Sequence, residues 1–243
     1  MMRIDRNYFR RYQVMKKIVF LFIILFATTA SFAAHLKGGW IQYEYISTDP
    51  NTHVSRYAIT VRQYLLCSSN AGQIDQQIYL GIFDGATNAL FKTVTVALSG
   101  TDIPNKTTYD PCISSPPPVC YRIDKYVALV DLPENVGGYV LTVQRCCRIA
   151  GIVNVSNSNT IGVTYTNKIP GMINGVSYVN NSSPVFAQKD TAVVCYNGHF
   201  TFDFSAYDND GDSLSYTFCN GLVGGGTASS GGGAQPNPPS APT

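Results

Sequence analysis

The chain has 243 residues, of which 45% are hydrophobic and only 13% are charged, a balance that supports a folded core and excludes a disordered chain. It carries 17 lysines and arginines against 15 aspartates and glutamates. Six of the basic residues and one of the acidic residues lie in positions 1–33, so the remainder has 11 basic and 14 acidic residues, a net charge of −3. This balance argues against nucleic acid as a partner, because phosphate binding needs clustered lysine and arginine.

The N-terminal segment has the three parts of a secretory signal peptide. Lys16 and Lys17 precede the apolar run Ile18–Phe26, and small residues follow up to Ala33, which is the arrangement that signal peptidase recognises. We expect residues 1–33 to be removed, with Met15 as a candidate true start. The run is shorter than the roughly 20 apolar residues of a membrane-spanning helix, so we expect no membrane span after cleavage. The mature protein is then secreted or displayed on the outer cell surface.

Export makes disulfides the expected state of the cysteines. The seven are Cys67, Cys112, Cys120, Cys146, Cys147, Cys195 and Cys219. Cys112 and Cys120 bracket a short proline-rich loop, and Cys195 and Cys219 enclose a longer one. We expect each of these two pairs to form a bridge. An odd count leaves one thiol free or paired elsewhere.

The remaining three cysteines leave more than one connectivity open. Successive strand residues point to opposite faces, so only one of Cys146 and Cys147 is expected to reach Cys67. A bridge between Cys146 and Cys147 is the alternative. Arg145 and Arg148 flank this pair and could lower a thiol pKa, but we expect a structural bridge in an exported protein.

Short runs of alternating apolar residues recur between positions 34 and 168, and a period of two is typical of strands with one buried face. The runs are Tyr57–Val61, Ile78–Ile82, Val94–Leu98, Val127–Leu129, Leu141–Val143 and Ile161–Tyr165. Turn-forming sequences such as Asp84-Gly85 separate them,. The pattern predicts an all-β fold in which residues 34–168 form an Ig-like antiparallel β-sandwich.

The alternating pattern changes at residues 169–182, which we interpret as a linker to a partial second β domain at 183–222. Aromatic residues alternate from Phe200 to Phe204, and apolar residues alternate from Leu214 to Phe218, which predicts two strands. A unit of about 35 residues is too small to close a core. Residues 223–243 are rich in Gly and Pro, and we expect them to form a flexible tail. We therefore expect the sequence to be the front end of a longer chain, or this unit to be completed by a partner.

Asp208, Asp210 and Asp212 form the strongest candidate site, because carboxylates at alternate positions beside Gly211 can offer several oxygen ligands to one Ca²⁺,. The loop is not an EF-hand, since the glycine comes at the fourth position and no glutamate closes it. The alternative is a hairpin turn with exposed acids. The repulsion of three close carboxylates favours the metal. Asp203, on the preceding expected strand, is a candidate fourth ligand.

The sequence holds no recognisable catalytic motif,, and its acids are dispersed, which argues against an exported hydrolase. We therefore expect a protein that is not an enzyme. Trp40, Tyr43 and Tyr45 lie on one expected strand and could stack on a sugar, although such a strand is more often part of a core. The expected partner is an extracellular glycan or a protein surface.

Four motifs together resemble one family of surface proteins. They are residues 35–40 (HLKGGW), residues 144–148 (QRCCR), residues 181–186 (NSSPVF) and residues 202–219 (FDFSAYDNDGDSLSYTFC). The combination is similar to the N-terminal region of gliding-motility-associated C-terminal-domain proteins, which are large adhesin-like chains with PKD or other Ig-like repeats.

The resemblance implies export by a signal peptide, transport across the outer membrane by the type IX route and a non-enzymatic, adhesin-like role. It also implies that the second unit is cadherin-like or PKD-like, with Asp208, Asp210 and Asp212 as calcium ligands and no catalytic residue. A polysaccharide-binding module of an exported multi-domain protein is the alternative function.

Overall fold

The computed structural model describes residues 15–17, 36–67, 74–104, 113, 121–187 and 197–224. The chain divides into two compact units, Met1–Phe32 and Ala33–Thr243. In the first unit only residues 15–17 are described, as a helical turn, so the predicted apolar run and the predicted cleavage site lie outside the described residues. No helix in the described ranges is long and apolar enough to cross a lipid bilayer.

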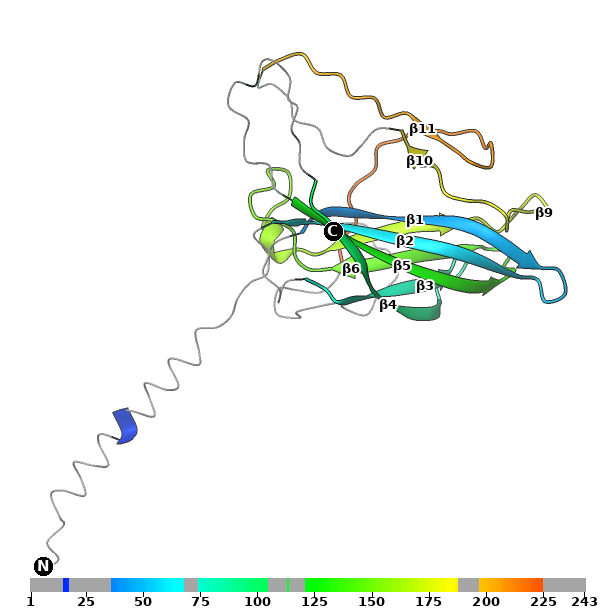
Figure 1. Cartoon of the computed structure of the whole chain (residues 1–243), viewed down its shortest axis with the longest axis horizontal. Coiled ribbons are helices and arrows are strands. Elements are labelled where there is room, and N and C mark those ends of the chain that lie inside the picture. Colours follow the sequence, from blue (N-terminus) through cyan, green and yellow to red (C-terminus); the bar gives the residue numbers. More distant parts are fainter. Residues whose placement is uncertain are drawn as a thin grey trace, which may run out of the picture. The chain divides into compact units, whose positions relative to one another are not determined.

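The second unit confirms the predicted all-β class (Figure 1). Seven strands form one antiparallel sheet in the order β1-β2-β5-β4-β3-β6-β7. They are β1 (Leu36–Asp49), β2 (Val54–Leu66), β3 (Gln77–Asp84), β4 (Leu90–Asp102), β5 (Tyr121–Pro133), β6 (Tyr139–Arg145) and β7 (Val163–Ile169). A short 3-10 turn, η2 (Ser158–Thr160), lies between β6 and β7.

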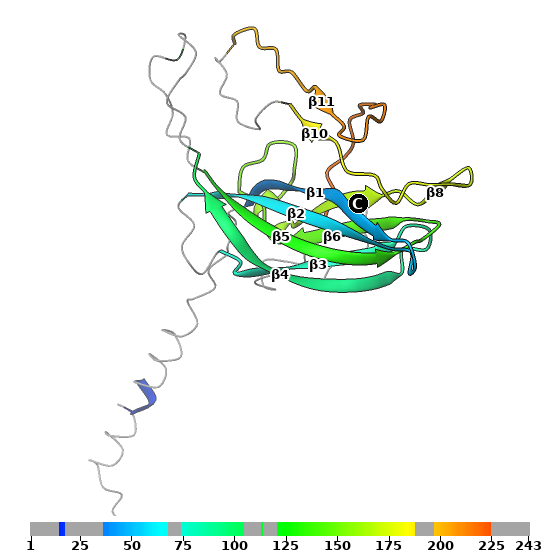
Figure 2. The ribbon, with the colours of Figure 1, turned by 45° about the vertical axis from the view of Figure 1, so that its right-hand side comes forward.

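The sheet folds over on itself at β4, which gives the sandwich its two layers. The first part of β4 pairs with β3 and its last part, from Leu98, pairs with β5. A register shift between Leu98 and Gly100 marks the change, as bulges do where a strand passes from one layer to the other. Figure 2 shows the strong curvature of β4. At the far end β7 returns to β1, where Asn167 Nδ2 donates to the Ile41 carbonyl oxygen at 2.9 Å, so the sheet is nearly closed.

Alternate residues of all seven strands fill the interior. The largest fully buried side chains are Tyr57, Tyr126, Phe83, Ile59, Ile78, Leu80, Ile82, Leu132, Leu141, Ile169, Gln63 and Val61. The predicted runs in β2, β3 and β6 face this core. Burial of these side chains is the main driving force for the fold.

The predicted inner face of β5 is wrong. Val127 and Leu129 are 38% and 65% exposed, whereas Tyr126, Val130 and Leu132 are buried. Apolar residues occupy both faces of this strand, so alternation alone does not fix which face points inward. Shifting the predicted pattern by one residue moves every side chain of the strand to the opposite face.

The predicted linker contains a hairpin. β8 (Met172–Ile173) pairs with β9 (Val176–Ser177). The connecting Asn174 and Gly175 have φ values of 52° and 79°, which is the backbone that a two-residue hairpin turn requires and that Asn-Gly favours.

In its described residues, the predicted second β domain (183–222) forms less sheet than the sequence predicts. Its only described ladder joins β10 (Val185–Phe186) to β11 (Ala206–Tyr207). The runs Phe200–Phe204 and Leu214–Phe218 are not strands, and most of their side chains are exposed. The physical reason is size, because so few residues cannot bury a second core. The boundaries at 168, 182 and 222 remain predictions.

Candidate functional site

One open edge of the sheet, on β1, is covered by residues 181–183. The backbone N–H of Ser183 donates to the Tyr43 carbonyl oxygen at 2.9 Å. Ser183 Oγ accepts from the Tyr43 N–H and donates to the Tyr43 carbonyl oxygen, both at 3.0 Å. Ser182 Oγ accepts from the Tyr45 N–H at 3.2 Å. The backbone N–H and carbonyl of Tyr43 and the N–H of Tyr45 are therefore satisfied, which protects this part of an edge that would otherwise pair with another chain.

The other open edge, on β7, is covered by the end of the described chain. The Thr164 N–H donates to the Leu222 carbonyl oxygen at 3.2 Å, and Thr164 Oγ1 donates to the Val223 carbonyl oxygen at 2.7 Å. The carbonyl of Gly224 lies so close to Gly162 that a Cβ at position 162 would overlap it. Residues on both sides of the predicted domain boundaries thus contact the same seven-stranded sheet.

The predicted calcium loop is a tight turn that contacts the segment covering β1. Asp208 Oδ1 accepts from the N–H groups of Asp210 and Asp212, at 2.9 and 3.3 Å, and Gly211 has a φ of 82°. Asp210 Oδ2 accepts from the Ser182 N–H. Asp212 Oδ2 accepts from Asn181 Nδ2 at 2.7 Å. Each carboxylate therefore has one oxygen engaged within the chain.

These acids also act on the buried hydroxyl of Tyr43, which donates to Asn181 Oδ1 at 2.6 Å. Burial raises the pKa of Tyr43, and the neighbouring Tyr57, Asp208, Asp210 and Asp212 raise it further. The hydroxyl therefore stays protonated and keeps its donor role.

The carboxylates, as arranged, do not make a metal centre. No group of three or more His, Cys, Asp or Glu side chains in the described ranges is placed to hold a metal ion. Asp203, the candidate fourth ligand, accepts from Ser205 N and Oγ at 2.8 and 3.0 Å. The acids fit the alternative of a turn, although the predicted strands of a hairpin do not flank it. Calcium binding remains a prediction.

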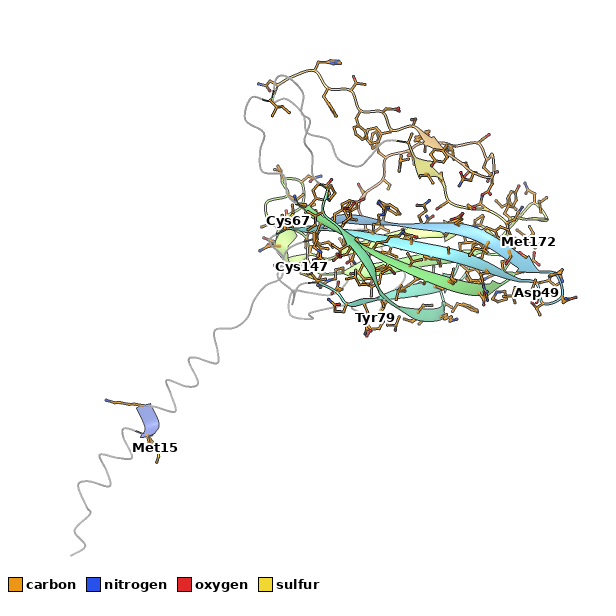
Figure 3. The ribbon with its side chains drawn as sticks, in the orientation of Figure 1. Met15, Asp49, Cys67, Tyr79, Cys147 and Met172 are labelled. Carbon is orange, nitrogen blue, oxygen red and sulfur yellow. A yellow bond between two sulfur atoms is a disulfide. The ribbon has the colours of Figure 1, made fainter. Side chains whose placement is uncertain are left out.

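Cys146 and Cys147 are bonded to each other, which corrects the expected bridge from Cys67 to one of them. The expectation assumed that both residues belong to a strand. β6 ends at Arg145, so the rule of opposite faces does not apply to the pair. Cys67 is also disulfide-bonded. Figure 3 shows Cys67 and Cys147 at one end of the sheet, with Asp49 and Met172 at the other.

The structure tests only some of the other predictions about the cysteines. Cys112, Cys120 and Cys195 lie outside the described residues. Cys219 is a free and exposed thiol, whereas the sequence predicts that it pairs with Cys195. The expected strand that would hold Cys219 in place does not form.

The two arginines beside the cysteines have structural partners. Arg145 Nε donates to Asp75 Oδ2 at 2.6 Å in a buried ion pair. Burial raises the pKa of Asp75, although Arg145 lowers it. Arg148 donates to two backbone oxygens, those of Gly162 at 3.2 Å and Leu222 at 2.9 Å. These roles agree with a structural interpretation of the QRCCR motif.

The three aromatic residues proposed for sugar stacking lie on opposite faces of β1. Tyr43 is 3% exposed and Tyr45 is half-buried, and both pack edge-on against Tyr57 in the interior. They belong to the core, as the alternative interpretation holds. Trp40, on the outer face, is half-buried and remains a candidate.

Trp40 belongs to a continuous surface on the outer face of β1, β2 and β5, which we name the aromatic platform. It consists of Lys37, Trp40, Arg62, Tyr64 and Tyr121. Trp40 Nε1 donates to the Tyr64 hydroxyl at 3.1 Å, and the Arg62 guanidinium lies 5.2 Å from the centroid of the Trp40 ring. The rings of Tyr64 and Tyr121 are 6.0 Å apart, and Lys37 Nζ lies 5.7 Å from the Tyr121 centroid.

Two polar atoms of the aromatic platform have unused hydrogen-bonding capacity. Arg62 Nε and the Tyr121 hydroxyl are buried and have no hydrogen-bond partner. Burial raises the pKa of Tyr121, and Asp102 raises it further. Buried polar groups are usually satisfied by protein, water or ligand. Because both atoms are buried, another molecule would reach them only if the neighbouring side chains moved.

Comparison with protein-family models, with curated proteins and with solved structures finds no match. The functional case therefore depends on the residues themselves.

Sequence reasoning finds Trp40 but misses Arg62, Tyr64 and Tyr121. Position 64 is on the polar side of the period-two pattern in β2, and a tyrosine there is a signal of a functional outer face. Tyr121 gives no such signal, because its place beside Tyr64 depends on the pairing of β2 with β5.

Proposed function

We propose that this protein is a non-enzymatic, exported surface protein, adhesin-like in role, that binds an extracellular partner through the aromatic platform. The aromatic platform is the main support for this proposal, because it brings aromatic rings and cations together on the outer face of a sheet and not in the core. Disulfide-bonded Cys67, Cys146 and Cys147 support an oxidising compartment,. The motifs similar to gliding-motility-associated surface proteins support a place at the N-terminal end of a longer chain.

The buried acids offer no support for a hydrolase. Asp75 pairs with Arg145, and Asp124 pairs with Arg122 at 2.6 Å. The two carboxylates are 7% and 0% exposed, so neither is placed to meet a substrate. A general acid needs access to the bond that it protonates.

The location is tested on intact cells that express the natural chain. We expect added protease to degrade the protein while a cytoplasmic control protein stays intact. We also expect Cys146 and Cys147 to resist alkylation until a reductant is added. Full protection from protease, with both thiols alkylated at once, would overturn the surface assignment.

Polysaccharide binding is the second candidate function, and Trp40 is the observation that favours it. Sugars stack their apolar faces on Trp and Tyr rings, which combine a large apolar area with a polar edge. Affinity electrophoresis in polysaccharide gels tests it. We expect Trp40→Ala to lose the retardation shown by the natural protein, while Tyr207→Ala, an exposed aromatic outside the seven-stranded sheet, keeps it. Equal mobility of all three proteins in every gel would reject the candidate.

A further inference from the structure

The aromatic platform carries positive charge as well as rings. Lys37 and Arg62 belong to it, and Lys125 lies directly opposite Arg62 in the β2–β5 register. Residues opposite each other in an antiparallel pair share a face, so Lys125 extends the platform across β5. Lys37 and Lys125 are exposed.

These three cations form no ion pair with another described residue. The ion pairs in the described part of the chain involve His53, Arg56, Arg122 and Arg145, and none involves Lys37, Arg62 or Lys125. Among the described acids, Asp102 lies opposite Ile123 on β5 and Glu44 lies opposite Ala58 on β2. Asp102 is close enough to Tyr121 to raise the pKa of its hydroxyl. A ligand on the platform would therefore meet both π-faces and unpaired positive charge.

We propose that the aromatic platform binds an acidic polysaccharide, one built of uronic acid units. The inference rests on the proposed polysaccharide function and specifies its ligand class. The apolar face of each sugar ring stacks on Trp40, Tyr64 or Tyr121. Its carboxylate pairs with the planar guanidinium of Arg62 or with a lysine.

Alternative ligands use the same surface less completely. A neutral polysaccharide would stack on the rings but leave three cations without partners. Single-stranded nucleic acid also combines stacking with positive charge, yet residues after position 33 carry a net charge of −3, which opposes a polyanion except where cations gather. A uronic acid polymer offers in every unit both an apolar ring face for the half-buried rings and a carboxylate for the cations,.

The test compares polygalacturonate with its methyl-esterified form, two polymers that differ mainly in charge. We expect binding to polygalacturonate, weakened by added salt, and at least tenfold weaker binding to the esterified polymer. The double variant K37Q/K125Q, changed only at exposed side chains, should bind polygalacturonate about tenfold more weakly. The matched double variant K92Q/K168Q, also exposed but outside the platform, should bind as the natural protein does.

Each of the other possible results would overturn a different part of the proposal. Equal binding to both polymers would overturn the charge selectivity and leave the polysaccharide function standing. Binding to neither polymer, but to neutral glucans in a Trp40-dependent way, would also overturn only this inference. Tighter binding to an oligothymidylate than to polygalacturonate would show that the platform prefers single-stranded nucleic acid to an acidic polysaccharide. An unchanged affinity of K37Q/K125Q for polygalacturonate would show that the aromatic platform is not the binding site.

Discussion

The carboxylate of Asp84 organises the turn between β3 and β4 and ties it to the turn before β6. Its Oδ1 accepts from the N–H groups of Ala86 and Thr87, at 3.0 and 2.7 Å, and from Thr87 Oγ1 at 2.8 Å. Its Oδ2 accepts from Asn135 Nδ2 at 2.7 Å. These bonds favour the charged form, the one from Asn135 most, and they lower the pKa of Asp84 to about 2.

A lowered pKa makes the contribution of Asp84 depend on pH. The charged form stabilises the fold above the ordinary pKa of 3.8, and this stabilisation is lost as the pH falls from there towards 2. We expect Asp84→Asn to lower the melting temperature at pH 6 and to have little effect at pH 2. The control is Asp102→Asn, whose carboxylate has no hydrogen bond or ion pair in the described part of the chain. A constant difference between Asp84→Asn and the natural protein from pH 6 to pH 2 would contradict the prediction.

At the scale of elements, Gly39 allows β7 to close against β1. A Cβ at position 39 would lie 2.6 Å from Cζ of Tyr165 and 2.5 Å from the Arg62 carbonyl oxygen. The ring of Tyr165 is buried and cannot move without disturbing its neighbours. We expect Gly39→Ala to destabilise the protein by about 1–3 kcal/mol, the usual cost of overpacking.

The neighbouring Gly38 provides a matched control for Gly39. A Cβ at position 38 meets nothing within 4 Å, so Gly38→Ala changes the backbone in the same way without the overlap. Urea unfolding should show the loss for Gly39→Ala only. Equal losses would mean that β1 needs glycine for its backbone and not for closure.

The covered edge of β1 depends on Ser183. Its hydroxyl satisfies both backbone groups of Tyr43 in a buried position. Ser183→Ala leaves these groups with fewer partners, and we expect a loss of about 1–3 kcal/mol in the free energy of unfolding. Ser215→Ala, at an exposed serine, should be neutral. A neutral result for Ser183→Ala would show that the backbone bond from Ser183 to Tyr43 is sufficient to hold the segment.

The elements that the sequence predicts well are those in which one face is clearly apolar. The runs in β2 and β3 alternate without ambiguity, so their strands and buried faces follow directly. Val127 and Leu129 mislead, because β5 is apolar on both faces. The aromatic platform needs the pairing of β1, β2 and β5, which periodicity does not contain. The hairpin at Asn174-Gly175 has a clear local signal that a linker interpretation overlooks.

At the scale of the whole molecule, the described residues 183–187 and 197–224 contact the sandwich through a few polar groups and contribute no buried core of their own. Asp210 and Asp212 bind the segment on β1, and Leu222 binds β7 and Arg148. Large side chains in between, such as Phe218, remain exposed. Such a region is expected to open locally at a low cost in free energy.

The contacts of Asp210 and Asp212 therefore decide how well this region is held. We expect the double variant Asp210→Ala, Asp212→Ala to be cleaved faster by protease between residues 183 and 224, with the sandwich left intact. Asn209→Ala, an exposed residue of the same turn, should be cleaved at the natural rate. Equal cleavage of the two variants would show that the acids do not hold the region.

Calcium is tested in the same measurement, because a ligand that binds only the folded state stabilises it by mass action. If the carboxylates turn their second oxygens to a common Ca²⁺, added calcium slows cleavage and raises the melting temperature of the natural protein, and chelator reverses both. The double variant then shows no response to calcium. Identical curves for the natural protein in calcium and in chelator would reject the metal and leave the acids with the role seen here, accepting hydrogen bonds from Asn181 and Ser182. The acids would then connect the turn to the segment that covers β1, through the backbone N–H of Ser182 and the side-chain amide of Asn181, without an ion.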